Sequence, residues 1–528
     1  MLKKALIYLI IYTKYMESDI LCLISNQNRV LKTNDGRISS QDIISGTVWI
    51  TLFVAGSKVL GFVRQMLAGM LFGTSRGYDA VIVALGPTDI VAGIIAGAFA
   101  SIAVPIYIEE KRHNHHIEYA RSLLTFTSIF LVLFGITLAI FPSFYIHIFA
   151  PTFEGEEFRM AENYLRIYSL LPLLNGWSNL FGSFLRAERM FFQYSVAQFS
   201  ANLFLIPAML VFYPFLKEGS YALSLEFGTG AIGLTAYLYG RKIWGKIPFG
   251  FGRGEIKHTF YLAIPLLLSS SVATINSVVD RAFASGLEVG SISSLNYSFT
   301  IVGMINGIIT SGILTTSLTS LSENAVNFNG KAIVSQTRTI FESMIKILAP
   351  ITAFTIVCAD LIVKIIYQRG AFTAESTLMT ASTLVAYSPM IITVPLTGIL
   401  GNIYISKKQT LRLTLISVPM IFLNAYLDWI LMIPLKQEGI AASSSIVSFL
   451  LLFLMIYDLG ISGMRGFFSI KTILPIMTSI IYVIIFLFML SKLNTLSRDL
   501  IAISVFLTLF TFFGRNEIRM VVKRFIKK

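Results

Sequence analysis

Apolar segments long enough to cross a membrane recur along this chain from about residue 45 to its end. A spanning helix needs about 20 mostly apolar residues. Of the 528 residues, 55% are hydrophobic and 13% are charged, whereas soluble domains carry about 25% charged residues. No polar linker is long enough to hold a separate soluble domain. We therefore expect an all-α polytopic membrane protein.

The pattern predicts about fourteen transmembrane helices. Residues 1–40 precede them as an N-terminal extension, which reflects either an upstream start codon or a weak membrane-surface anchor. The helices are expected at residues 45–72, 78–108, 118–143, 160–185, 194–213, 220–243, 258–284, 291–320, 340–366, 376–404, 411–432, 438–459, 470–490 and 498–514.

Basic residues gather on one set of connections. The loops after the even-numbered spans, together with the tail at 515–528, hold 23 of the Lys and Arg residues, against 7 in the other set. Cytoplasmic loops carry the excess of Lys and Arg. We therefore expect both ends of the chain in the cytoplasm and the protein in the inner membrane.

The two halves of the chain resemble each other at an offset of 217 to 220 residues. Gly73 matches Gly290, and Glu218-Gly219 matches Glu438-Gly439. We expect two parallel six-helix lobes, at 41–244 and 252–460, followed by a helix pair at 466–514. Parallel repeats of this kind place the substrate site between the lobes, which favours alternating access.

Charged residues at membrane depth mark candidate sites, because each costs several kcal/mol unless it faces a cavity or a partner. Lys58 and Arg64 lie within the first predicted helix, and Arg281 lies within the seventh. We expect these three to line a basic cavity that suits an anionic ligand such as a phosphate or pyrophosphate. Internal ion pairing is the alternative, such as Arg64 with Asp79 and Arg281 with Asp280.

Three acidic residues fall in the same predicted helices. Asp79 opens the second helix, Asp89 lies deeper within it, and Asp280 precedes Arg281. We interpret all three as structural or cavity-lining acids, with Asp79 as a helix N-cap that also pairs with a cation.

Motifs for enzyme chemistry are absent from the sequence. It has no GxxxxGK[ST] loop, no HExxH and no nucleophile elbow. The GxGxxG pattern at 228–233 lies in an apolar segment with no strand before it, so close helix packing explains it. We expect no catalytic residue, no metal site, no cofactor and no nucleic-acid partner.

Several motifs resemble a known transporter family. They are Ser57-Lys58-Val59-Leu60-Gly61-Phe62-Val63-Arg64, Tyr78-Asp79-Ala80, Gly97-Ala98-Phe99, Asp280-Arg281-Ala282-Phe283 and Arg369-Gly370-Ala371-Phe372-Thr373. Over about residues 41–515 they resemble the MurJ/MviN lipid II flippases of the multidrug/oligosaccharidyl-lipid/polysaccharide exporter superfamily. The resemblance implies a fourteen-helix two-lobe fold. It also implies a lipid-linked disaccharide-peptide on undecaprenyl pyrophosphate as cargo, met by Arg64 and Arg281.

The candidate cavity departs from the family pattern in its charges. Lys58 stands where the family has an arginine, and Gln65 where an acidic residue is common. The family's basic pair on the second helix is Val91-Ala92 here, and the following Glu-Gly-Ala-Phe is Ala96-Gly97-Ala98-Phe99. The family's basic position after the tyrosine of the eighth helix is Thr300.

Four functions remain open from the sequence. The first is a monomeric lipid II flippase coupled to the membrane potential or to an ion. The second is a flippase for another lipid-linked oligosaccharide, of the exopolysaccharide or O-antigen type. A cation-coupled drug exporter is disfavoured by the basic cavity and the extra helix pair. A membrane scaffold that transports nothing is the fourth.

Overall fold

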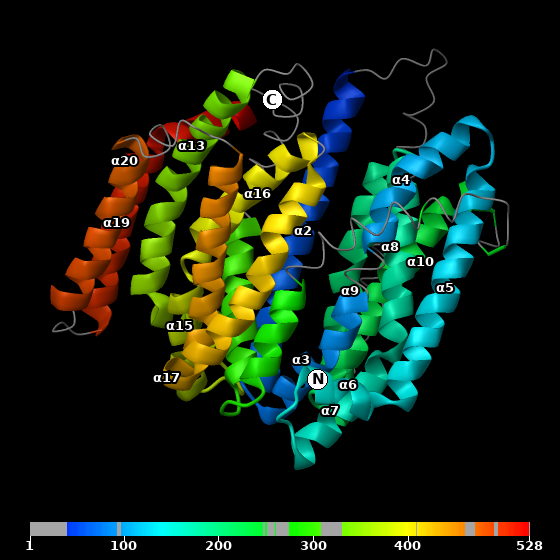
Figure 1. The fold of residues 1–528 in the computed structure, drawn as a ribbon, viewed down its shortest axis with the longest axis horizontal. Helices are drawn as coiled ribbons and strands as arrows, with labels where there is room; N and C mark the ends of the chain where they lie inside the picture. The colour runs from blue at the N-terminus through cyan, green and yellow to red at the C-terminus, as the bar shows by residue number, and fades with distance from the viewer. Residues whose placement is uncertain are drawn as a thin grey trace, which may run out of the picture. The chain divides into compact units, whose positions relative to one another are not determined.

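The computed structural model describes residues 40–91, 97–245, 249–250, 259, 274–307, 330–407, 409–459, 470–489 and 495–526 (Figure 1). The chain divides into two compact units, Met1–Phe53 and Val54–Lys528. Every helix from α3 onward belongs to the second unit. The expected N-terminal extension lies outside the described residues except for its last residue, Ser40.

The regular secondary structure of the first half is entirely helical among its described residues. Ser75 caps α3, because its side-chain oxygen accepts a hydrogen bond from the backbone N–H of Tyr78 at 3.2 Å. The elements of this half are α2 (Ser40–Phe72), α3 (Arg76–Asp89), α4 (Gly97–Arg112), α5 (His116–Ile140), α6 (Pro142–Phe149), α7 (Gly155–Ile167), η2 (Tyr168–Leu170), α8 (Leu171–Ala187), α9 (Phe191–Leu216) and α10 (Gly219–Trp244).

The second half begins with helical residues 274–284 and 291–307. Its further elements are α13 (Gly330–Val357), α14 (Ala359–Tyr367), α15 (Ala374–Tyr387), α16 (Met390–Ser406) and α17 (Thr410–Asp458), followed by α19 (Ile470–Met489) and α20 (Thr495–Ile526). Within the first half α8 packs against α4, α5 and α10; within the second, α17 packs against α15 and α16, and α13 against α19 and α20.

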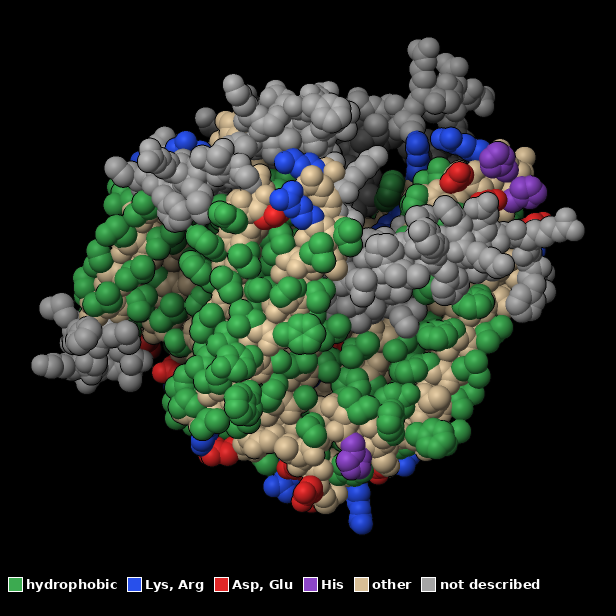
Figure 2. Space-filling model, viewed as in Figure 1, with side chains coloured by type: hydrophobic (Ala, Val, Ile, Leu, Met, Phe, Trp, Pro, Cys, Tyr) green, Lys and Arg blue, Asp and Glu red, His purple; other side chains and the backbone are tan. Residues whose placement is uncertain are grey.

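The surface of these helices is apolar where lipid is expected. Figure 2 shows hydrophobic side chains over most of the visible face, with Lys, Arg, His, Asp and Glu mainly at its upper and lower ends. Exposed apolar side chains include Phe215, Phe422 and Phe512. A large exposed apolar surface is unfavourable in water and is typical of a protein surrounded by lipid. The expected all-α membrane fold is therefore confirmed.

Length and composition alone qualify four described helices as membrane spans: His116–Ile140, Phe191–Leu216, Ser335–Val357 and Leu411–Asp458. The pair Ala374–Tyr387 and Met390–Tyr404, bent by 42°, is a further candidate. Helix α17 is broken at Lys436, whose φ of 49° is not helical, so it corresponds to the two spans expected at 411–432 and 438–459. The count of fourteen stays a prediction.

Matching turns recur in the two halves. Lys217, between α9 and α10, has φ 46° and ψ −121°, and Lys436, inside α17, has φ 49° and ψ −133°. Both precede the Glu-Gly pairs that the repeat aligns. Gly73 and Gly290, another aligned pair, have φ of +57° and +93°, where side chains are disfavoured. Similar backbone turns thus occur at or next to positions that the sequence repeat aligns.

These glycine turns lie where the two halves meet. The Tyr297 hydroxyl donates a hydrogen bond to the carbonyl oxygen of Gly73 at 2.9 Å. The Ala371 backbone N–H donates to Met70 O at 2.8 Å. The rings of Tyr78 and Tyr297 stack with centroids 5.4 Å apart. Buried polar and aromatic contacts therefore hold the halves together at this end.

Candidate functional site

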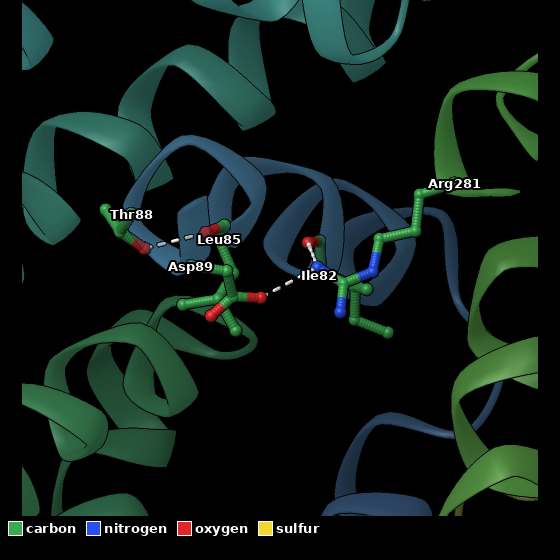
Figure 3. A network of polar contacts seen from close by, with 5 residues as sticks. All are labelled: Ile82, Leu85, Thr88, Asp89 and Arg281. Carbon is green, nitrogen blue, oxygen red and sulfur yellow. Dashed lines mark hydrogen bonds and ion pairs between the residues drawn. The ribbon is translucent and has the colours of Figure 1, made fainter. Parts of the chain in front are cut away.

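An ion pair between Arg281 and Asp89 joins the two halves within the predicted membrane region. The Arg281 Nη1 atom lies 3.1 Å from Asp89 Oδ2 and donates a second, longer hydrogen bond of 3.4 Å to the carbonyl oxygen of Ile82 (Figure 3). The two side chains are 18% and 35% exposed. The pair is thus partly open to solvent and within reach of a ligand.

The end of α3 brings Asp89 to this position. Pro87 has no backbone N–H, so it cannot donate the helical hydrogen bond to Val83. The helix ends two residues later, at Asp89, and residues 90 and 91 continue as a π-helical turn. Thr88 Oγ1 donates to Leu85 O at 2.7 Å, which satisfies one carbonyl at this end (Figure 3).

Arg281 also lines a cavity of about 610 Å³ in the second half. The cavity is mostly apolar, with a polar patch where Asp280, Arg281, Asn276, Asn424 and Ser444 meet. Its apolar walls come from α16, α17 and helical residues 291–307, among them Phe299, Met390, Val394 and Leu451. A mostly apolar cavity with a few convergent polar groups is typical of a ligand site.

Two carboxylates are buried at the polar patch. Asp280 accepts hydrogen bonds from Asn424 Nδ2 at 2.7 Å and from Ser444 Oγ at 3.0 Å. Asn424 Nδ2 also donates to Asp428 Oδ2 at 2.9 Å, so one amide bridges both acids. Ser443 Oγ donates to the other Asp428 oxygen. Because two buried negative charges repel each other, this arrangement calls for a proton or a bound cation.

Asp79 lies elsewhere and holds a helix of the other half. Its carboxylate accepts hydrogen bonds from the backbone N–H of Gly290 at 2.6 Å and of Ser293 at 2.7 Å. These N–H groups open helical residues 291–307, whose positive end favours an anion. The cap expected of Asp79 therefore serves this helix, while Ser75 caps α3. The alternative pairing of Asp79 with Arg64 is not formed among the described residues.

Lys58 and Arg64 have different surroundings. Lys58 Nζ donates to the carbonyl oxygen of Gly307, across the halves, at 2.8 Å. Arg64 Nε is buried and has no hydrogen-bond partner among the described residues. Nearby on α2, the carbonyl oxygen of Ser57 accepts a hydrogen bond from Asn202 Nδ2 of α9 at 3.1 Å, so this part of α2 packs within the first half. No described contact joins Lys58 or Arg64 to Arg281.

A family model for the lipid II flippase MurJ matches residues 69–512 of this chain. The chain belongs to the lipid II flippase MurJ family. A probable lipid II flippase MurJ of Buchnera aphidicola subsp. Schizaphis graminum is 27% identical over 438 residues, covering 81% of this chain and 85% of the relative. One of Thermotoga maritima is 23% identical over 405 residues, covering 76% and 82%.

Solved structures show the same fold. A lipid II flippase MurJ in an inward closed conformation has a TM-score of 0.76 and 22% identity, and covers 89% of this chain and 100% of its own. An inward-facing MATE family transporter of the MOP superfamily has a TM-score of 0.63 and 12% identity, covering 80% and 96%. With its apolar helices, membership of the MurJ family makes this a multi-pass inner-membrane protein.

One acid of the carboxylate network, Asp428, and its bridging amide, Asn424, were not predicted from the sequence. Asp428 lies inside the span expected at 411–432, so the cost of a buried charge was a usable signal. However, Asp428 lies near the end of that span, where charged residues are common and therefore a weaker signal. Asn424 and the serines carried no comparable signal, because polar uncharged residues are common in membrane helices.

Proposed function

We propose that this protein is a lipid II flippase. It moves the peptidoglycan precursor on undecaprenyl pyrophosphate from the inner to the outer leaflet by alternating access between its halves. The observation that carries the proposal is the family match over residues 69–512. The contacts of Gly73, Asp79 and Tyr297 support it, because they close the end that the positive-inside rule assigns to the outer side.

Arg281, Arg64 and Lys58 are the proposed pyrophosphate ligands. Arg281 is the best supported of them, since it lines the cavity and uses only Nη1 in its described contacts. Guanidinium groups bind phosphate oxygens in pairs, whereas the ammonium of Lys58 acts as a point charge. Arg64 is proposed because its buried Nε has no hydrogen-bond partner among the described residues.

The proposed topology keeps the lobes at 41–244 and 252–460, with both chain ends in the cytoplasm and the protein monomeric. The helix pair at 466–514 receives the lipid tail. Its two helices contact each other through the Tyr482 hydroxyl, which donates to Ala502 O at 3.0 Å. Ile481 and Ile485 of α19 are exposed, as a lipid-facing surface requires.

Asp280 and Asp428 are the proposed coupling site. Neutralising this buried pair by a proton or a monovalent cation links ion binding to the helices that carry it. Asp280 directly precedes Arg281 in the sequence. Binding of a proton or a cation at the carboxylates therefore acts on the same helical turn that carries the proposed pyrophosphate ligand.

A flippase for another lipid-linked oligosaccharide is the second candidate. It is favoured by the altered charges of the second predicted helix, where Val91-Ala92 replaces the family's basic pair and Asp89 adds a carboxylate. Both candidates share the polyprenyl pyrophosphate and differ in the sugar.

Depletion and replacement test the proposal. A bacterium depleted of its own lipid II flippase should resume growth when it makes this protein. Lipid II should again be exposed on the outer leaflet, where reagents added outside the cell can modify it. The variant Arg281→Ala should fail, while Lys364→Ala, on the exposed side of α14, should succeed. Continued accumulation of lipid II in the inner leaflet with well-expressed protein would overturn lipid II as the cargo.

A further inference from the structure

Asp89 is the anion that occupies Arg281 in this structure. The contact uses Nη1 of the guanidinium, at 3.1 Å from Asp89 Oδ2 (Figure 3). Arg281 Nε and Nη2 have no hydrogen-bond partner among the described residues. The arginine can therefore meet a phosphate with these two nitrogens, but only beside the Asp89 carboxylate.

Two anions on one guanidinium repel each other. Coulomb energy between unit charges a few ångströms apart is large wherever water is partly excluded, and Arg281 is 18% exposed. A phosphate that binds Arg281 must therefore push Asp89 away or force it to take up a proton. The Asp89 carboxylate thus weakens the binding of an anionic cargo at Arg281.

We propose that Asp89 is a counter-ion that holds Arg281 until cargo binds and then yields it to the cargo's phosphate. The proposal rests on the proposed function, because it takes a polyprenyl pyrophosphate as the cargo. Since Asp89 belongs to the first half and Arg281 to the second, this exchange also breaks an ion pair that links the halves. Anion binding is in this way coupled to their relative movement.

The Tyr168 hydroxyl is a candidate donor for Asp89 once Arg281 leaves. The Tyr168 hydroxyl is fully buried and has no hydrogen-bond partner among the described residues. A buried hydroxyl without a partner is costly, and a carboxylate released from its arginine is a suitable acceptor.

Binding measured on the purified full-length chain tests this, with farnesyl pyrophosphate as a soluble prenyl pyrophosphate. Asp89→Asn should bind the probe about tenfold more tightly, because the competing charge is gone while the side-chain size is kept. Asp89→Glu should behave as the unaltered protein. Asp458→Asn is the matched control: it removes the acid of the Arg412–Asp458 pair, whose N–O distance is 2.8 Å, and should leave binding unchanged.

A double-mutant cycle separates this role from a structural one. In an Arg281→Ala background the probe should bind weakly, and adding Asp89→Asn should then change little. A loss of folding would lower binding in every background. Asp89→Ser provides a second neutral variant if Asp89→Asn is unstable.

Two results would overturn the proposal. One is unchanged or weaker binding by both folded neutral variants; the other is an equal tightening without Arg281. Suppose that Asp89→Asn binds the probe more tightly but the unaltered protein fails to move lipid II in the depletion assay. Asp89 would then be retained as the counter-ion, and lipid II would be rejected as the cargo. Absence of probe binding by the unaltered protein and by Asp89→Asn would overturn the counter-ion proposal, while complementation in the depletion assay decides the proposed function independently.

Discussion

The carboxylate of Asp79, in α3, accepts a hydrogen bond of 2.6 Å from the backbone N–H of Gly290, 211 residues later. Ser293 adds a second backbone hydrogen bond at 2.7 Å and a further one from its hydroxyl. One buried acid thus holds the first turn of a helix in the opposite half. This tie must break whenever the two halves separate at this end.

Replacing Asp79 by alanine should destabilise the protein. The change leaves the backbone N–H groups of Gly290 and Ser293 buried without an acceptor, which costs about 1–3 kcal/mol for such a group. Thermal unfolding of the purified protein should therefore shift to lower temperature. Asp79→Asn, which keeps one acceptor oxygen, should lose less; an equal loss by both variants would contradict the capping role.

Gly370 should not tolerate a side chain. Its φ is +62°, and a Cβ atom there would lie 2.3 Å from the carbonyl oxygen of Met70. The φ alone costs about 1–2 kcal/mol for other residues. Gly370→Ala should lower both the unfolding temperature and complementation. Gly303→Ala is the control, since nothing lies within 4 Å of its Cβ position; comparable losses in the two variants would refute the steric argument.

Neutralising Asp428 should uncouple transport from its ion. Asp428→Asn removes one of the two carboxylates bridged by Asn424, and with it the need for a compensating proton or cation. In reconstituted vesicles, flipping should lose its dependence on an imposed sodium or proton gradient. Binding of farnesyl pyrophosphate should persist. Asp360→Asn, which changes an exposed acid, should keep the gradient dependence. If Asp428→Asn also keeps the gradient dependence, Asp280 and Asp428 are excluded as the coupling site.

Fixing the contact between Thr74 and Ser376 should stop the transport cycle. Their hydroxyl oxygens lie 2.8 Å apart across the two halves. Cysteines at both positions, with Cys22 and Cys358 changed to alanine, should form a disulfide on oxidation and block flipping. A reductant should restore the rate, and each single cysteine should be insensitive. Full activity of the oxidised double variant would exclude opening at this end.

Lys58→Arg should keep or improve function, whereas Lys58→Ala should reduce it. Arginine retains the positive charge and adds the paired donors that suit a phosphate. Growth of the depleted bacterium at limiting expression measures the difference. Failure of Lys58→Arg alongside normal expression would indicate that the hydrogen bond to Gly307 O, rather than the charge, is what matters at this position.

Local sequence properties accounted for most of the fold. The length and apolarity of each segment predicted helices close to their observed bounds, as for α9 (Phe191–Leu216), which was expected at 194–213. Helix breaks were harder to predict. The span expected at 160–185 is three elements, α7, η2 and α8, because a 3₁₀ turn at Tyr168–Leu170 interrupts it.

The side chains that charged residues contact could not be predicted from local sequence. Arg281 was marked as a charge within a span, but the only ion-pair partner considered for it, as an alternative to a cavity position, was its neighbour Asp280. Successive residues on a helix point in different directions, so Asp280 faces Asn424 while Arg281 reaches Asp89. Only the packing of the two halves could indicate Asp89.

The sequence by itself determined that this is a helical membrane protein, that its halves repeat, and that it resembles the MurJ family. Those properties depend on residue type and spacing along one segment. The tertiary structure alone decided that Arg281 meets Asp89 across 192 residues and that Asp79 caps the helix after Gly290. These contacts depend on which helices face each other, because a buried charge takes the compensating partner that packing brings within reach.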